Sequence, residues 1–144
     1  MYTFNEPQAD PNERNSETGT SPIIEAVRRR IREIVQALLD HGASTTLCDN
    51  DGRSPLLWAA HEGDLDCVQL LHSHGSPLDI ADSQQQTSLT VAAVQNHIDI
   101  VRYLVNHGAR NDAALVASSL RVGPILCLIK KLSRNCHKIS CVPD

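Results

Sequence analysis

The sequence predicts an all-α protein built from stacked pairs of short helices. Two observations carry this prediction: the same residue types return every 33 residues, and aromatic residues are scarce. Of the 144 residues 41% are hydrophobic but only 3% are aromatic, so a core has to be built from Leu, Ile, Val and Ala. Closely packed helices suit such a core better than a β-sandwich does.

The 33-residue period is visible in several columns of residues. The columns are Gly42, Gly75 and Gly108; His41, His74 and His107; Leu38, Leu71 and Leu104; Val35, Val68 and Val101; and Ala26, Ala59 and Ala92. Repetition in phase over about this length is typical of a solenoid, in which each unit buries its apolar face against its neighbours.

The first helix of the middle unit is marked at both ends. Asp49–Gly52 is turn sequence, because Asn, Asp and Gly tolerate the positive φ of tight turns. Ser54 suits an N-cap and Pro55 suits the first helical position. The sequence therefore predicts a helix that begins at Pro55 and ends near Gly63.

The second helix of this unit is expected from Leu65 to about Ser73. Asp64 can cap its start, its apolar residues fall at helical spacing, and Gly75 supplies the left-handed residue that ends it. Arg30 stands where the other units have Gly63 or Asn96. If this position needs positive φ, Arg costs about 1 kcal/mol there. Gln85 likewise replaces a turn glycine.

This unit resembles the ankyrin repeat, which follows a turn with Thr-Pro-Leu-His-x-Ala-Ala, a Gly, and a Leu-Leu run ending in Gly-Ala. The middle unit matches over Asp51–Ala60 (DGRSPLLWAA), with Leu57 in place of the motif His, and again over Gly63–Leu65, Val68–Leu71 and His74–Ser76. The third unit matches over Thr87–Ala93 and Val101–Ala109, and the first over Ser21–Ala26 and Leu38–Ala43. The resemblance covers Thr18 to about Val116 and implies a solenoid of stacked helix-turn-helix pairs joined by β-hairpin-like turns.

The period also divides the chain into three parts. Residues 1–17 are polar and are expected to form a disordered N-terminal arm. Residues 18–116 hold three repeats, 18–50, 51–83 and 84–116. The phase is lost after Ala109, and residues 117–144 are interpreted as a degenerate capping unit with a flexible tail. The loss of phase is also compatible with a fragment or splice variant of a larger ankyrin protein.

The resemblance implies a non-enzymatic adaptor or scaffold. In ankyrin-like proteins the hairpin tips and the exposed edge of the first helix line a concave face, which usually binds another protein. Carried over by position, the expected partner-binding residues are Thr20, Arg28, Arg29, Asn50, Asp51, Arg53, Trp58, His61, Glu62, Ser83, Gln84, Gln86, Val94 and Gln95.

Two features of this face have alternative interpretations. Trp58, the single tryptophan, is either a core residue or an exposed anchor for a partner. The Arg28–Arg30 cluster with Arg32 is either a solvated inter-helix turn or a functional site. As a functional site it would be a nuclear-import signal or a contact for an acidic partner.

No cofactor, metal site or catalytic site is expected. The histidine column repeats with the units, and stacked units lie about 8–10 Å apart, too far for two such histidines to share a zinc ion. Cys127, Cys136, His137 and Cys141 match no zinc-finger spacing. No phosphate loop, nucleophile elbow or metalloprotease motif occurs, so the chain is not expected to be an enzyme.

The expected partner is another protein. The net charge is −4, so a whole-domain basic footprint for nucleic acid is absent, and no apolar run reaches the length of a membrane span. We expect a monomer in the cytoplasm or nucleus, neither bound to nucleic acid nor inserted in a membrane. The alternative function is substrate recognition in a cullin-type ubiquitin ligase, whose helical box needs a Leu four residues before a Cys. Here Gly123 stands four residues before Cys127, and Leu120 seven before it.

Overall fold

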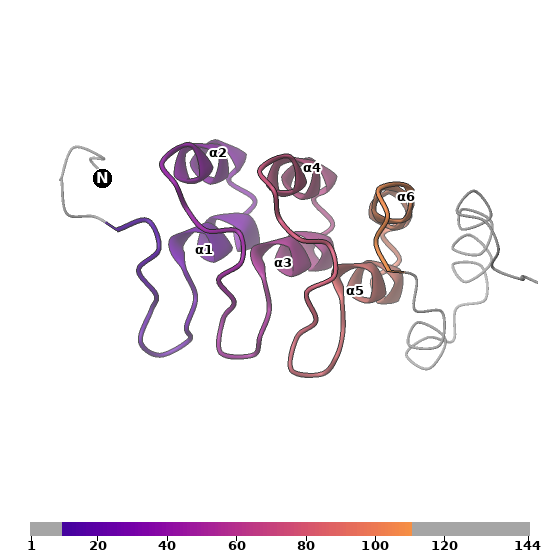
Figure 1. Cartoon of the computed structure of the whole chain (residues 1–144), viewed down its shortest axis with the longest axis horizontal. Coiled ribbons are helices and arrows are strands. Elements are labelled where there is room, and N and C mark those ends of the chain that lie inside the picture. Colours follow the sequence, from indigo (N-terminus) through magenta and orange to yellow (C-terminus); the bar gives the residue numbers. More distant parts are fainter. Residues whose placement is uncertain (1–9, 111–144) are drawn as a thin grey trace, which may run out of the picture.

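The computed structural model describes residues 10–110, which form six helices and no β-strand. The helices are α1 (Pro22–Arg28), α2 (Arg32–Asp40), α3 (Pro55–Glu62), α4 (Leu65–Ser73), α5 (Ser88–Val94) and α6 (Ile98–Asn106). Figure 1 shows α2, α4 and α6 in one row, α1, α3 and α5 in a second row, and three long loops that project beyond the second row. This arrangement confirms the all-α solenoid of helix pairs.

The central unit begins and ends its helices where the sequence predicts. Ser54 caps α3, because its Oγ accepts a hydrogen bond from the Leu57 amide at 3.2 Å. Gly63, with φ 78°, ends this helix. Asp64 caps α4 by accepting from the Cys67 amide at 3.3 Å, and Gly75 follows the end of α4 with φ 87°.

The position shared by Arg30, Gly63 and Asn96 is left-handed in all three units. The φ angles are 59°, 78° and 64° in that order. The position therefore has the positive φ on which the expected cost of Arg30 depends. Gln85 also has a positive φ of 63°, in the turn position where the earlier units have glycine.

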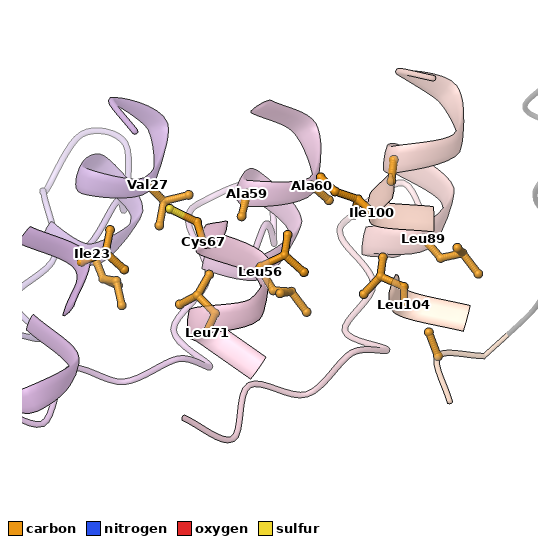
Figure 2. Packing of buried hydrophobic residues seen from close by; sticks show 14 of the residues in the cluster. Ile23, Val27, Leu56, Ala59, Ala60, Cys67, Leu71, Leu89, Ile100 and Leu104 are labelled. Atoms are coloured by element: carbon orange, nitrogen blue, oxygen red, sulfur yellow. The ribbon is translucent and has the colours of Figure 1, made fainter. Parts of the chain in front are cut away.

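The core is aliphatic and lies between the two rows of helices. Leu56 of α3 and Leu71 of α4 are fully buried, and α3 packs against both α1 and α5. Cys67 has no exposed surface and fills space between these leucines and the preceding unit, as expected for a small core residue (Figure 2).

The segment 10–17 departs from the expectation of a disordered arm. The Oδ1 atom of Asn12 accepts from the Ser44 amide at 2.6 Å, and the Asn15 amide donates to the Thr20 carbonyl at 2.8 Å. These contacts hold the segment against the first unit. Composition alone suggested disorder because the segment is polar, but polar side chains can satisfy backbone groups that a preceding repeat would otherwise satisfy.

Several predictions lie outside the described residues. They are the arm over 1–9, the degenerate capping unit and tail over 117–144, and the cysteines and Leu120 on which the zinc and ubiquitin-ligase alternatives depend. Among the helices that are described, none has the length and apolar character needed to cross a bilayer.

Candidate protein-binding face

The candidate binding residues all lie on one set of elements, which we call the inner face. It consists of helices α1, α3 and α5 with the ends that follow them, and of the hairpin loops 15–20, 49–53 and 82–86. The loops carry Thr20, Asn50, Asp51, Arg53, Ser83, Gln84 and Gln86. The helices and their ends carry Arg28, Arg29, Trp58, His61, Glu62, Val94 and Gln95.

The second and third hairpins are each held at the base by a buried aspartate of their own. Asp49 Oδ1 accepts from the amides of Asp51 and Arg53 at 3.0 and 2.9 Å. Asp82 Oδ1 repeats the arrangement one unit later with the amides of residues 84 and 86, at 2.8 and 2.9 Å. Each carboxylate thus satisfies two backbone donors and fixes the shape of its loop.

The hairpins also bond to one another. The Asn50 amide donates to the Thr18 carbonyl at 3.1 Å, and the Ser83 amide donates to the Asp51 carbonyl at 2.9 Å. The Asn50 side chain adds a bond from Nδ2 to the Glu17 carbonyl at 2.9 Å. The three tips therefore form one continuous edge, with each tip held by its neighbour.

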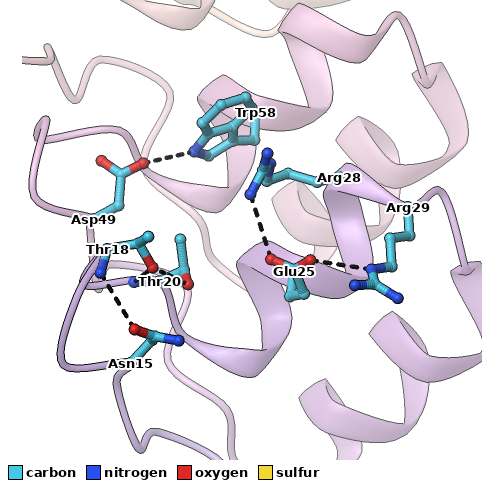
Figure 3. A network of polar contacts seen from close by, with 8 residues as sticks. All are labelled: Asn15, Thr18, Thr20, Glu25, Arg28, Arg29, Asp49 and Trp58. Atoms are coloured by element: carbon cyan, nitrogen blue, oxygen red, sulfur yellow. Dashed lines mark hydrogen bonds and ion pairs between the residues drawn. The ribbon is translucent and has the colours of Figure 1, made fainter.

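Trp58 is neither a fully buried core residue nor a fully exposed anchor. Its side chain is half-buried and packs against the edge of the core. The indole Nε1 donates to Asp49 Oδ2 at 2.9 Å, so the same carboxylate that shapes the second hairpin also orients the ring (Figure 3). Trp58 joins the core to the inner face and keeps part of its ring open.

Two guanidinium groups lie over the Trp58 ring. The Cζ atom of Arg28 is 4.8 Å from the ring centroid and that of Arg53 is 5.1 Å from it. These distances are within the range of cation–π contacts. Arg28 comes from α1 and Arg53 from the loop before α3, so the ring brings together cations of two repeats.

Glu25 orients the arginines of α1. Its carboxylate lies 3.4 Å from Arg28 Nη1 and 3.0 Å from Arg29 Nε, at helical spacings of three and four residues (Figure 3). Arg30 instead donates to the carbonyl of Glu62 in the next unit. The cluster 28–30 is thus exposed, as a solvated turn would be, but each of its side chains has a defined partner.

The third unit contributes a neutral part of the face. Val91 stands where the second unit has Trp58, and it is buried. The exposed groups are Val94, Gln95 and the polar residues Ser83, Gln84 and Gln85 of the third hairpin. Charge on the inner face is therefore concentrated in the first two units.

Sequence reasoning did not select Glu25 or Asp49, although both organise the face. Each leaves a signal in the sequence. Asp49 recurs as Asp82 at the repeat period, and Glu25 precedes Arg28 and Arg29 by three and four residues, the spacing of neighbours on one helix face.

The histidine column has a structural role. The Nδ1 atoms of His41, His74 and His107 lie 2.7, 3.0 and 2.8 Å from the carbonyl oxygens of the residues four positions earlier. Each ring therefore satisfies a carbonyl in the last turn of its helix. Over residues 10–110 no group of three or more His, Cys, Asp or Glu side chains is placed to hold a metal ion.

A family model described as ankyrin repeats (3 copies) matches this chain over residues 3–82 and 23–114. The matched residues include all six helices and the three hairpin loops. No curated protein matches the chain.

Proposed function

Because the chain belongs to the ankyrin repeat family, whose members are protein–protein interaction modules, we propose that it is a non-enzymatic adaptor that binds a partner protein through its inner face. The partner would contact the hairpin tips and the exposed edges of α1, α3 and α5. The adaptor would provide a binding surface and would not catalyse a reaction.

The observation that carries this proposal is the preorganisation of the inner face. The tips are bonded to one another, and Asp49 holds both the second hairpin and the Trp58 indole. A surface that is fixed before binding loses little conformational entropy when a partner arrives. Tryptophan and arginine, which meet at the centre of this face, are the residues that most often dominate binding energy.

Site-directed photo-crosslinking tests the proposal. A photoreactive amino acid placed at His61 or Gln95, both exposed on the inner face, should capture one and the same protein from cells. The matched control positions are Gln69 and Arg102, which are exposed on the outer helices α4 and α6. We expect these positions to capture much less of that protein.

The test compares inner-face positions with outer-helix positions, so capture of a protein at one position does not by itself support the proposal. If all four positions capture the same proteins equally, or if the outer helices capture more, the inner face is not the binding surface. A melting curve for each variant should match the unsubstituted chain, since all four side chains lie outside the core.

A further inference from the structure

The contact of Arg28 and Arg53 with one indole ring points to the chemistry of the partner. The side chains of Arg28 and Arg53 remain 42% and 34% exposed although both guanidiniums lie on the Trp58 ring. An aromatic face holds a guanidinium through its π electrons, so the contact uses none of the N–H donors. The ring therefore fixes both cations and leaves their donors available.

Few of these donors are used inside the protein. Arg28 directs Nη1 at Glu25 at 3.4 Å, a long hydrogen bond. Arg53 Nε lies 4.0 Å from Asp82 Oδ2, which is an ion pair without a hydrogen bond. A guanidinium carries five N–H donors in a planar fork that matches a carboxylate. Both arginines thus retain the capacity to bind an acidic group.

The charges around the pair favour a singly charged ligand. Glu25 lies between Arg28 and Arg29, and Asp51 and Glu62 are carried on the same face. Asp49 at the indole N–H and Asp82 beside Arg53 add to these carboxylates, which together offset the positive charge of the arginines, so the site is not strongly basic. The carboxylates repel every anion, but they repel a doubly charged phosphate or the closely spaced phosphates of a nucleic acid more strongly than a singly charged side-chain carboxylate, which can accept from an available guanidinium donor.

We propose that Arg28, Trp58 and Arg53 form a docking site for an acidic segment of the partner protein. Asp or Glu carboxylates of that segment accept hydrogen bonds from the guanidiniums, and a neighbouring apolar group covers the open part of the indole. This inference rests on the proposed function, because it assigns a ligand chemistry to the inner face.

Trp58 itself supplies the readout, since it is the single tryptophan of the chain. The full chain is titrated with a short peptide of alternating Glu and Ala, and the tryptophan emission is followed. We expect a saturable change in emission that weakens as salt is added, because the contact is between partly exposed charges. The twin peptide with Gln in place of Glu should give no saturable change.

Substitutions assign the binding to the two arginines. Arg28→Gln and Arg53→Gln should each weaken binding of the Glu peptide about tenfold, the effect of one charge-assisted hydrogen bond. Arg102→Gln is the matched control, because Arg102 is an exposed arginine on the outer helix α6, and it should leave the affinity unchanged. Thermal melting checks that each variant is folded.

Three results would overturn the inference. They are equal binding of the Glu and Gln peptides, unchanged affinity in both arginine variants, and tighter binding of a third twin with phosphoserine in place of Glu. If any of these occurs while crosslinks from His61 and Gln95 still capture a partner, the acidic ligand is wrong and the adaptor function stands. If those crosslinks are lost as well, both proposals fail.

Discussion

Within residues 10–110, three residues other than glycine hold a left-handed backbone: Arg30, Gln85 and Asn96. Each occupies a position where another unit has glycine, such as Gly63 or Gly52. Asparagine visits this region readily, but for Arg and Gln the conformation costs about 1 kcal/mol. Equivalent positions in the repeats therefore share the same backbone conformation but contribute differently to stability, because their residues tolerate it to different degrees.

Gln85→Gly should stabilise the protein. Glycine relieves the backbone strain at φ 63°, about 1 kcal/mol, and this gain exceeds the added entropy of the unfolded chain, about 0.4–1 kcal/mol, by up to about 0.6 kcal/mol. Urea denaturation measures the free energy of unfolding. Asn96→Gly is the control and should gain less, since asparagine already tolerates its φ of 64°. A destabilised Gln85→Gly would show that strain is not the dominant effect at this residue.

Cys67 makes the stability depend on pH in the alkaline range. Burial, followed by the hydrogen bond from Sγ to Asp64 at 3.1 Å, raises the pKa of its thiol from 9.0 to about 12. The folded state thus holds the proton more tightly than the unfolded state. The resulting stabilisation is present below pH 9 and is lost as the pH rises from 9 towards 12.

Cys67→Ala tests this dependence. The variant is less stable at neutral pH because it leaves a cavity, but its free energy of unfolding should fall less steeply above pH 9 than that of the unsubstituted chain. Burial also raises the pKa of Tyr103, which affects both proteins equally, so the difference between the two slopes isolates the thiol. Parallel slopes would contradict the assignment.

At the scale of an element, the second hairpin depends on one carboxylate. Asp49 accepts hydrogen bonds from two backbone amides of its own loop and from the indole of α3. The loop and the helix are therefore positioned by the same group. Its equivalent in the third hairpin, Asp82, accepts from two backbone amides in the same way, and its Oδ2 atom lies 4.0 Å from Arg53 Nε.

Asp49→Ala should destabilise the protein by about 2–3 kcal/mol, because two backbone amides and the Trp58 indole lose their acceptor. The tryptophan emission of the folded variant should also change, since the indole N–H loses its bond. Denaturation followed by fluorescence measures both effects. Asp51→Ala, at the exposed tip of the same hairpin, is the control and should cost less than about 0.5 kcal/mol. Similar costs for the two variants would rule out the special role of Asp49.

At the scale of the whole molecule, the units are stabilised by their contacts with neighbours. Helix α3 packs against α1 on one side and α5 on the other, and α4 contacts both α2 and α6. In such an array stability is the sum of the units and of the interfaces between them. A defect in the central unit therefore weakens two interfaces at once.

Leu56→Ala should cost about 2–5 kcal/mol, because the fully buried Leu56 side chain of α3 leaves a cavity in the central unit. Ile34→Ala is the comparison: this side chain on α2 is 41% exposed, and the change should stay within about 0.5 kcal/mol. Urea unfolding followed by circular dichroism measures both. If Ile34→Ala proved as costly as Leu56→Ala, exposure in the described structure would not predict stability.

The sequence by itself determined the repeat period, the bounds of α3 and α4, their caps and the left-handed position of Arg30. These are local properties. A helix cap or a φ angle involves only residues within one turn of the chain, so both can be predicted from the residue types there. The period extends this local information to the whole solenoid, which is why the fold class could be predicted.

Only the tertiary structure decided how the inner face is organised. The contact of Arg28, Trp58 and Arg53 joins residues of two units, and the bond from the Ser44 amide to Asn12 Oδ1 joins the first unit to the segment before it. The role of Glu25 likewise depends on Arg28, which pairs with Glu25 and reaches the Trp58 ring of the next unit. Repeat columns identify the exposed positions, but they do not tell which side chains of neighbouring units touch. That depends on the distance and rotation between stacked units, which packing of the aliphatic core sets.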